Sequence, residues 1–467
     1  DSEHLQPIAC LLNLPWSSSR CYPPAAEDEN KSNDGGRPRS NSNEQDEATI
    51  RLEERSIQLV ADYLEKDRKK GFDLSKPPLM RCHLTTIDER SDGTERLQHV
   101  LVLTIHHILF DGWSLGLLLQ MVADEYSAAL PRPLSAWSEV SDDDVNLPAA
   151  EKPPSYHDFI EWEAEQDRAT ARTYFKQLLG KVSAPSPFPR YTSTSPAAIR
   201  AAKGARTSAS ASTARTISFD VTALHAASSA LECSLASAVH TAWSIVFSAF
   251  SGSKEVLYAT TVSGRSAPLR HSDRVIGLML NTLPVLVSVV PSSTSALSSV
   301  VPSFRTLLLA VHEQILSSLE HESCPLADIL QNCVPPPPKS GETASGYSEG
   351  QLLWAMLDFE PEQPPIPLQP DRDEKPGVAG CTLMSPRVID RIGFALSLRA
   401  SHHTTQGRDG TKHILRLMAT SEDERLGASF LERLLVAMKG CLQMAGRDVA
   451  SANVMDLRKA ADATVHE

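Results

Sequence analysis

No stretch of this sequence is long and apolar enough to cross a membrane. The apolar runs all fall short of the ~18 consecutive apolar residues that a transmembrane helix needs. Lys and Arg gather into no stripe, and the formal net charge is −13. Nucleic acids and anionic membrane surfaces are bound through clustered basic residues. The sequence therefore predicts no nucleic-acid partner, no membrane partner and a cytoplasmic location.

Paired cysteines are also missing. Eight cysteines are scattered along the chain, none at Cys-x-x-Cys spacing, which argues against a zinc site or a dense disulfide framework. We expect free, buried thiols in a reducing compartment and no metal site. Apolar content of 41% and charged content of 22% are close to the globular average. A chain of 467 residues then favours two lobes, each with a core.

Composition along the chain indicates where the lobes divide. Residues 27–49 are almost entirely polar and are predicted to be a disordered insertion. Residues 190–214 are Ser, Thr and Ala with scattered Arg, which is typical of a linker. We therefore predict an N-terminal lobe at 1–189, a linker at 190–214 and a C-terminal lobe at 215–467.

Hydrophobic periodicity predicts strands and helices in both lobes, an α/β arrangement. Helical spacing appears at 50–67, 113–126, 156–179, 235–250, 304–319 and 424–444. Short apolar runs typical of strands appear at 79–84, 98–105, 215–219, 255–262, 352–359 and 414–419.

Two adjacent histidines, His106 and His107, directly follow the strand predicted at 98–105. A loop at a strand end projects side chains while the sheet holds them still. Imidazole has a pKa near neutrality, so it can take and return a proton at working pH. Gly112 is expected to let the backbone turn tightly before the next helix. A lone histidine is most often structural, but the spacing to Asp111 and Gly112 favours a catalytic loop.

The string HHILFDGWS at His106–Ser114 resembles the H-H-x-x-x-D-G motif of condensation domains of nonribosomal peptide synthetases, which belong to the chloramphenicol acetyltransferase-like superfamily. Other segments resemble further motifs of that family, in the order the family has them. They are Phe72–Leu74 with Pro78, Leu79 and Arg81; Ser155–Trp162; Tyr174–Phe175; Val262–Arg265; Ile276–Pro284; and His321–Leu326.

The chain also departs from the family pattern. The opening S-x-x-Q-x-x-x-W and R-H-E-x-L-R motifs are missing, and R-D-x-S-R-N-P-L is unrecognisable before Leu352. We interpret the chain as a condensation domain truncated at its amino end, and the long Ser-, Pro- and Ala-rich insertions as typical of a fungal enzyme. A siderophore synthetase is one source of such a domain. The resemblance implies two acetyltransferase-like α/β lobes in a V-shaped arrangement, with an active-site tunnel between them.

The resemblance also implies an activity, the joining of a donor acyl or peptidyl thioester to the amine of an acceptor aminoacyl thioester. His107 would take the amine proton, stabilise the oxyanion or hold the amine in line, and the residues do not choose between these roles. The Gly112 amide would face the oxyanion. His106 is expected to be structural. Asp111 is expected to pair with Arg265 across the lobes rather than orient His107 as part of a triad.

Three further residues are placed beside the tunnel by the same resemblance: Trp113, Ser114 and Asn281. Core packing is the alternative for Trp113, and a capped bulge is the alternative for Asn281. The domain itself is expected to bind no cofactor, since the phosphopantetheine arms belong to carrier domains on the donor and acceptor sides. An adjacent adenylation domain is a further expected partner.

Several other functions remain open. An epimerisation domain typically continues D-G-x-S-W, whereas here Trp113 precedes Ser114. Plant-type acyltransferases that use coenzyme A carry a late D-F-G-W-G, and this chain has no such string. A terminal condensation domain that releases product by cyclisation or ester formation, and a degenerate domain that only binds carriers, both stay as alternatives.

Overall fold

The computed structural model describes two compact units, Asp1–Ser114 and Leu115–Glu467, and each is treated by itself. The residues described are 16–21, 61, 63–91, 94–129, 155–180, 182, 213–290, 302–334, 353–360, 394–407, 410–421 and 426–466. The insertion predicted at 27–49 and most of the linker predicted at 190–214 lie outside these ranges. The linker and the lobe boundary drawn from it therefore remain predictions.

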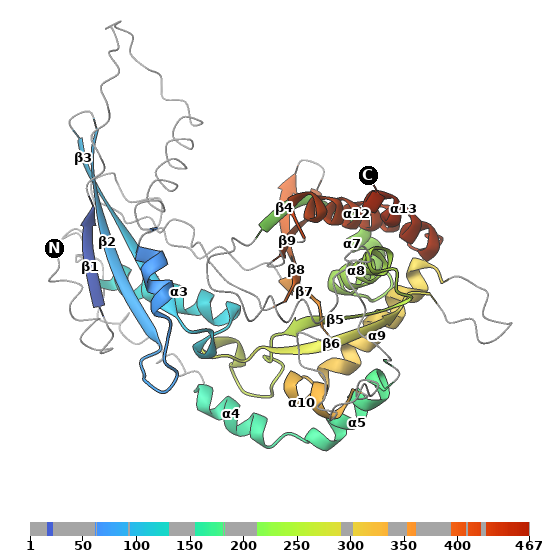
Figure 1. Ribbon diagram of the computed structural model, residues 1–467, viewed down its shortest axis with the longest axis horizontal. Helices are drawn as coiled ribbons and strands as arrows, with labels where there is room; N and C mark the ends of the chain where they lie inside the picture. Colours follow the sequence, from blue (N-terminus) through green and yellow to red (C-terminus); the bar gives the residue numbers. More distant parts are fainter. Residues whose placement is uncertain are drawn as a thin grey trace, which may run out of the picture. The chain divides into compact units, whose positions relative to one another are not determined.

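The first unit contains a three-stranded sheet of order β1-β2-β3 (Figure 1). Strand β1 (Trp16–Cys21) pairs parallel with β2 (Met80–Ser91), and β2 forms an antiparallel hairpin with β3 (Thr94–Ile105). Both strands of the hairpin are longer than the runs predicted at 79–84 and 98–105. The hairpin register pairs Met80 with Ile105, so the start of β2 lies beside the end of β3, where the doubled histidine follows.

The second unit is built on a six-stranded mixed sheet of order β4-β9-β8-β7-β5-β6. The strands are β4 (Thr213–Asp220), β5 (Glu255–Val262), β6 (Asn281–Ser288), β7 (Ala355–Glu360), β8 (Leu396–Gly407) and β9 (Gly410–Ser421). Strands β5, β7 and β8 run parallel to one another, and the other pairings are antiparallel. The α/β fold class predicted from the sequence is confirmed.

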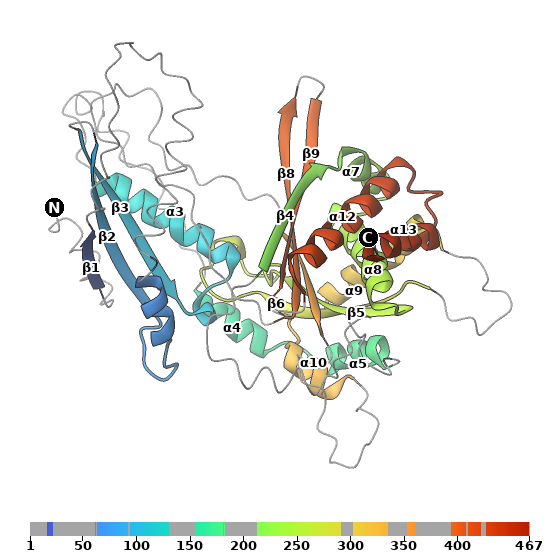
Figure 2. The same ribbon diagram turned by 45° about the horizontal axis from the view of Figure 1, so that its top comes forward.

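Helices cover both faces of this sheet (Figures 1 and 2). The larger core lies under α7 (Thr222–Ser229), α8 (Leu235–Ser251), α9 (Phe304–Leu319), α12 (Ala428–Arg447) and α13 (Val454–His466). Almost every residue of α8 is buried, including Trp243 and Phe247. Such a helix needs apolar residues all round, which explains why its sequence shows so little polar face.

A smaller core lies under α5 (Arg168–Leu179) and α10 (Leu326–Asn332), which contact each other on the opposite face of the sheet. The single helix predicted at 156–179 is two helices, α4 (Tyr156–Ala164) and α5. The break occurs because the Asp167 carboxylate accepts the backbone N–H groups of Ala169 and Thr170, capping α5. These helices belong to the second unit, whereas the sequence placed them in the N-terminal lobe.

Two expectations from composition concern the described part of the chain. Cys82, Cys233, Cys324, Cys333 and Cys441 are free and buried, as predicted for scattered cysteines. No helix within the described ranges is long and apolar enough to cross a membrane.

Candidate functional site

The doubled histidine lies where β3 ends, in the first unit. The His106 N–H donates to the carbonyl oxygen of Leu79 at 2.9 Å, which extends the pairing of β2 with β3 by one step. A turn of 3-10 helix, η1 (His107–Leu109), follows, and α3 (Gly112–Ala129) begins three residues later. Regular structure therefore holds this short loop at both ends.

His106 supports the loop from within. Its half-buried ring meets Phe72 edge-on, with ring centroids 5.9 Å apart. Its Nδ1 accepts the N–H of Ile108 at 3.2 Å. Because Nδ1 acts as an acceptor, a neutral His106 carries its proton on Nε2. These contacts are those of a structural residue, the role expected for His106.

Phe72 is itself fixed by a buried ion pair. The Arg81 guanidinium lies 4.0 Å above the Phe72 ring, and its Nε donates to Asp67 Oδ1 at 2.7 Å. Burial acts to raise the pKa of Asp67, but hydrogen bonds from Arg81 and Thr104 and the Arg81 charge outweigh it and lower that pKa. Asp67 was not anticipated from the sequence, because one acid at the end of a polar helix carries no distinguishing pattern.

His107, the expected catalytic residue, points its ring into accessible space. Its side chain is exposed, and the ring stacks on Phe110 with centroids 5.1 Å apart and planes 16° from parallel. Burial of this ring behind the sheet would have removed it from any chemistry on a substrate. The geometry instead holds one face of the imidazole and leaves the ring accessible.

Asp111 begins the helix that follows. The residue is only 2% exposed, and its Oδ1 accepts the N–H of Ser114 at 2.7 Å, which makes Asp111 the N-cap of α3. Ser114 is fully buried, so the expectation that it contacts a substrate is not supported. Trp113 is 40% exposed, so the alternative of core packing for Trp113 is wrong. Asp111 and Arg265 belong to different units, and their pairing remains a prediction.

Gly112 does not make the tight turn expected of it. It is the first residue of α3, its φ lies outside the left-handed region, and a Cβ built on it would meet nothing within 4 Å. The backbone conformation here is open to any residue. A reason for glycine at this position must therefore lie in the space beside its Cα and not in its φ.

Three of the family-like motifs meet in the second unit, beyond the end of β5. Residues 263–266 form the loop after β5, 276–280 lead into β6, and 321–325 turn between α9 and α10. Gly264 adopts φ +65°, and a Cβ there would overlap the carbonyl oxygen of Met279. Only glycine fits both the conformation and the close approach.

Arg265 is anchored within this loop. Its Nη1 donates to the carbonyl oxygens of Ser272 at 2.8 Å and Val275 at 2.9 Å. The Ser272 hydroxyl donates back to the Arg265 carbonyl oxygen at 2.9 Å. The guanidinium direction is therefore set by the backbone of the segment that follows it.

Asn281 joins β6 to the turn at 321–325. Its Nδ2 donates to the carbonyl oxygens of Glu322 and Cys324, each at 2.7 Å, and its Oδ1 accepts the N–H of Thr282 at 2.8 Å. Both amide donors are used by the backbone. The expected contact of Asn281 with a substrate gives way to the structural alternative, in which this side chain ties loop segments together.

The tyrosine of the Ser155–Trp162 motif packs on the same region. Tyr156 donates its hydroxyl proton to the Leu278 carbonyl oxygen at 2.9 Å, and its ring occupies the space where a Gly277 side chain would be. Phe159 and Met279 are buried alongside. Two motifs more than 100 residues apart thus form one packing unit.

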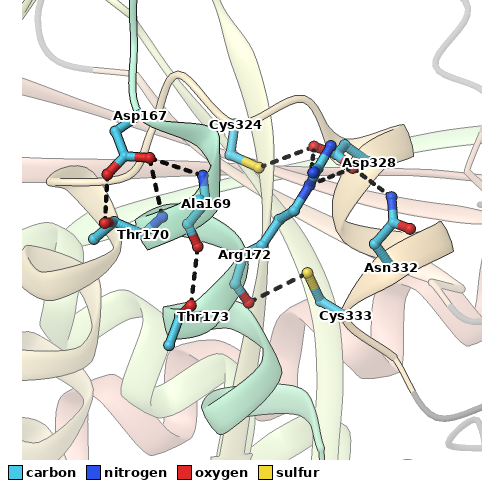
Figure 3. A network of polar contacts seen from close by, with 9 residues as sticks. All are labelled: Asp167, Ala169, Thr170, Arg172, Thr173, Cys324, Asp328, Asn332 and Cys333. Carbon is cyan, nitrogen blue, oxygen red and sulfur yellow. Dashed lines mark hydrogen bonds and ion pairs between the residues drawn. The ribbon is translucent and has the colours of Figure 1, made fainter.

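A polar network fixes the turn from behind (Figure 3). Arg172 of α5 donates through Nε to both carboxylate oxygens of Asp328 on α10, at 3.0 and 2.9 Å. Asn332 donates to Asp328 Oδ1, and the Cys333 thiol donates to the Arg172 carbonyl oxygen at 3.5 Å. Burial raises the pKa of the Cys324 thiol to about 11, so that thiol is a poor nucleophile at neutral pH.

Asp328→Asn should make this network less sensitive to acid. Partial burial acts to raise the pKa of Asp328, but hydrogen bonds from Arg172 and Asn332 and the Arg172 charge lower it overall. A lowered folded-state pKa gives stability that is present above the unfolded pKa and lost as pH falls through the folded one. We expect the variant to melt below the parent at pH 7, by about 0.5–1 kcal/mol for this part-exposed pair, and the gap to close by pH 3.

Thermal melts of parent and variant between pH 3 and 7 measure this difference. Lys459→Ala, which removes one partner of an exposed pair on α13, is the control and should shift the melting temperature little at any pH. A pH-independent gap for Asp328→Asn would contradict the assignment.

Comparisons with known proteins agree with the motifs. The condensation domain family model matches residues 33–343, more than half of the chain. A protein of the linear gramicidin synthase of Brevibacillus parabrevis is 29% identical over 250 residues, which cover 51% of this chain and 3% of that protein. Surfactin synthase subunit 3 of Bacillus subtilis (strain 168) is 25% identical over 402 residues, covering 86% of this chain and 27% of that protein.

Solved structures agree in fold. The first condensation domain of the calcium-dependent antibiotic synthetase, in complex with a substrate analogue, matches with a TM-score of 0.51 at 18% identity, covering 84% of this chain and 73% of that one. A chain from the complex of the X-domain and OxyB from teicoplanin biosynthesis matches with a TM-score of 0.55 at 17% identity, covering 95% and 79%. This chain spans only a small part of its curated relatives, and it belongs to the condensation domain family.

Proposed function

We propose that this chain forms an amide bond between a donor acyl or peptidyl thioester and the amine of an acceptor aminoacyl thioester. The observation that carries the proposal is the accessible His107 ring, stacked on Phe110 and held between the end of β3 and the Asp111-capped start of α3. An imidazole fixed in this way can meet a substrate in one orientation. The family to which the chain belongs supplies the reaction class.

The proposed step needs one proton acceptor. The acceptor nitrogen attacks the thioester carbon, the carbonyl becomes a tetrahedral oxyanion, and the C–S bond breaks to release the donor thiolate. The nitrogen loses a proton as the C–N bond forms, and that proton finally resides on the released thiol. His107 would receive the proton or hold the amine in line, and positioning alone contributes up to ~7–11 kcal/mol.

Gly112 has a proposed place in the same step. Its N–H is the first of α3, where backbone donors lack partners within the helix and the helix dipole favours negative charge. An oxyanion formed beside His107 would be stabilised by such a donor. The open space at the Gly112 Cα would admit the substrate backbone, which explains glycine at a position with an ordinary φ.

The substrates would be delivered by carrier domains. In this proposal the phosphopantetheine arms of a donor and an acceptor carrier hold the reacting groups, the chain itself supplies no cofactor, and an adenylation domain loads the acceptor. Similarity to synthetase proteins supports these partners.

The direct test mixes the purified chain with a donor carrier loaded with an acyl group and an acceptor carrier loaded with an aminoacyl group. Mass spectrometry of the acceptor carrier should show the amide product accumulating with enzyme concentration. Hydrolysis of the donor alone, or cyclised or esterified product, would favour the releasing alternative. Carrier binding without product would favour the degenerate one.

Substitution of Asp111 separates its two proposed roles. We propose that the Asp111 carboxylate caps α3 and also balances the charge of Arg265. Asp111→Ala should lose both and destabilise the chain by about 0.5–2 kcal/mol from the cap alone. Asp111→Asn keeps a good cap and loses only the charge. Under the pairing, Asp111→Asn and Arg265→Ala both lower melting temperature and turnover, whereas parental values for Asp111→Asn would leave only the cap.

A further inference from the structure

The turn between α9 and α10 contains a carboxylate that the reaction does not use. Glu322 is 6% exposed, and burial, its largest influence, raises the pKa of its carboxyl group. A buried acid is costly unless hydrogen bonds compensate it. Its partners therefore show what the structure gains by keeping it there.

Those partners are the two neighbours of Arg265. The Ser266 hydroxyl donates to Glu322 Oε1, and the Gly264 N–H donates to the same carboxylate. Asn281 in turn grips the Glu322 backbone carbonyl at 2.7 Å. The carboxylate is thus fixed to β6 on one side and holds the loop immediately before and after Arg265 on the other.

The loop is confined from its other side as well. Gly264, at φ +65°, lies against the carbonyl oxygen of Met279, so the loop cannot shift in that direction without a clash. Glu322 prevents the opposite displacement. Between these two constraints the Arg265 side chain leaves the loop in a single direction, and its Nη1 meets the carbonyl oxygens of Ser272 and Val275.

We propose that Glu322 is a positioning residue that acts through Arg265 by holding residues 264–266. This inference rests on the proposed function only for its effect on turnover, since the effect on the loop is independent of it. The sequence showed Glu322 merely as one letter of an imperfect motif. Its contacts, which join three chain segments, appear only in the folded chain.

Two measurements test the proposal on the full chain. Hydrogen exchange of the peptide covering 263–266 should accelerate at least tenfold in Glu322→Ala, because two hydrogen bonds to a charged acceptor are lost. Glu322→Gln retains an oxygen acceptor and should stay within about threefold of the parent. Glu320→Ala, an exposed acid near the same turn, should leave this exchange unchanged. Parental exchange in Glu322→Ala would overturn the proposal.

Turnover supplies a double-mutant cycle. Glu322→Ala should lower condensation about tenfold in the parent background and have no further effect in Arg265→Ala, because a residue that acts through Arg265 is silent without it. Losses that multiply would show an independent role and overturn the proposal. If the parent forms no amide, the proposed function fails, and hydrogen exchange alone still decides the role of Glu322.

Discussion

His107→Ala should lower condensation by ~10²–10⁴-fold, the range expected when a positioned proton acceptor is removed, while the chain keeps its fold. The ring is exposed and stacks on Phe110, so little packing is lost. His107→Phe preserves an aromatic stack and removes only the imidazole. Both variants should melt within about 2 °C of the parent, since surface substitutions usually change stability by less than ~0.5 kcal/mol.

The measurement is amide formation between loaded carriers, followed by mass spectrometry, together with thermal melts. His106→Ala provides the contrast, because its half-buried ring packs on Phe72 and accepts the Ile108 N–H. We expect that variant to lose stability as well as activity. Parental turnover by His107→Phe would remove this imidazole from the chemistry, and the proposed reaction would lose its proton acceptor.

Gly264→Ala should be the most damaging small substitution in the second unit. A side chain at φ +65° costs ~1–2 kcal/mol, and the added carbon overlaps the carbonyl oxygen of Met279, an overpacking cost of ~1–3 kcal/mol. Together these predict about 3 kcal/mol. At ~2–4 °C per kcal/mol for a domain of about this size, the melting temperature should fall by roughly 6–12 °C. Turnover should fall too, because the loop carries Arg265.

Gly112→Ala is the matched control. Both glycines belong to motifs typical of the family, yet a Cβ at Gly112 meets nothing within 4 Å and its φ is ordinary. The melting temperature of Gly112→Ala should stay within about 1–2 °C of the parent, since helical positions accept alanine. Any loss of turnover there would report the space beside His107. Equal melting temperatures for Gly264→Ala and Gly112→Ala would contradict the conformational assignment.

Strong periodicity explains which elements were predictable. The helix predicted at 304–319 and the strand predicted at 255–262 match α9 and β5 at both ends. At the end of α8, Gly252 adopts φ 75° just beyond the predicted helix end. These boundaries are written in local sequence, as apolar spacing, a serine cap or a glycine stop.

Other elements carry no such local signal. Strand β8 begins in the central sheet as an alternation of Leu396, Leu398 and Ala400, but ends in polar residues that carry no core pattern. The break between α4 and α5 depends on one Asp167 side chain that competes for backbone N–H groups. A periodic helix pattern continues across such a cap, so the two helices were predicted as one.

Local chemistry alone specified the loop His106–Gly112, the family and the reaction class, because the doubled histidine, Asp111 and Gly112 are contiguous and their spacing is preserved whatever surrounds them. The partners of those residues were decided by folding. Asp67 reaches Phe72 through Arg81, Asn281 binds backbone instead of substrate, and Glu322 holds the loop of Arg265. Such contacts join residues far apart in the chain, and a hydrogen bond between distant segments leaves no periodicity in either one.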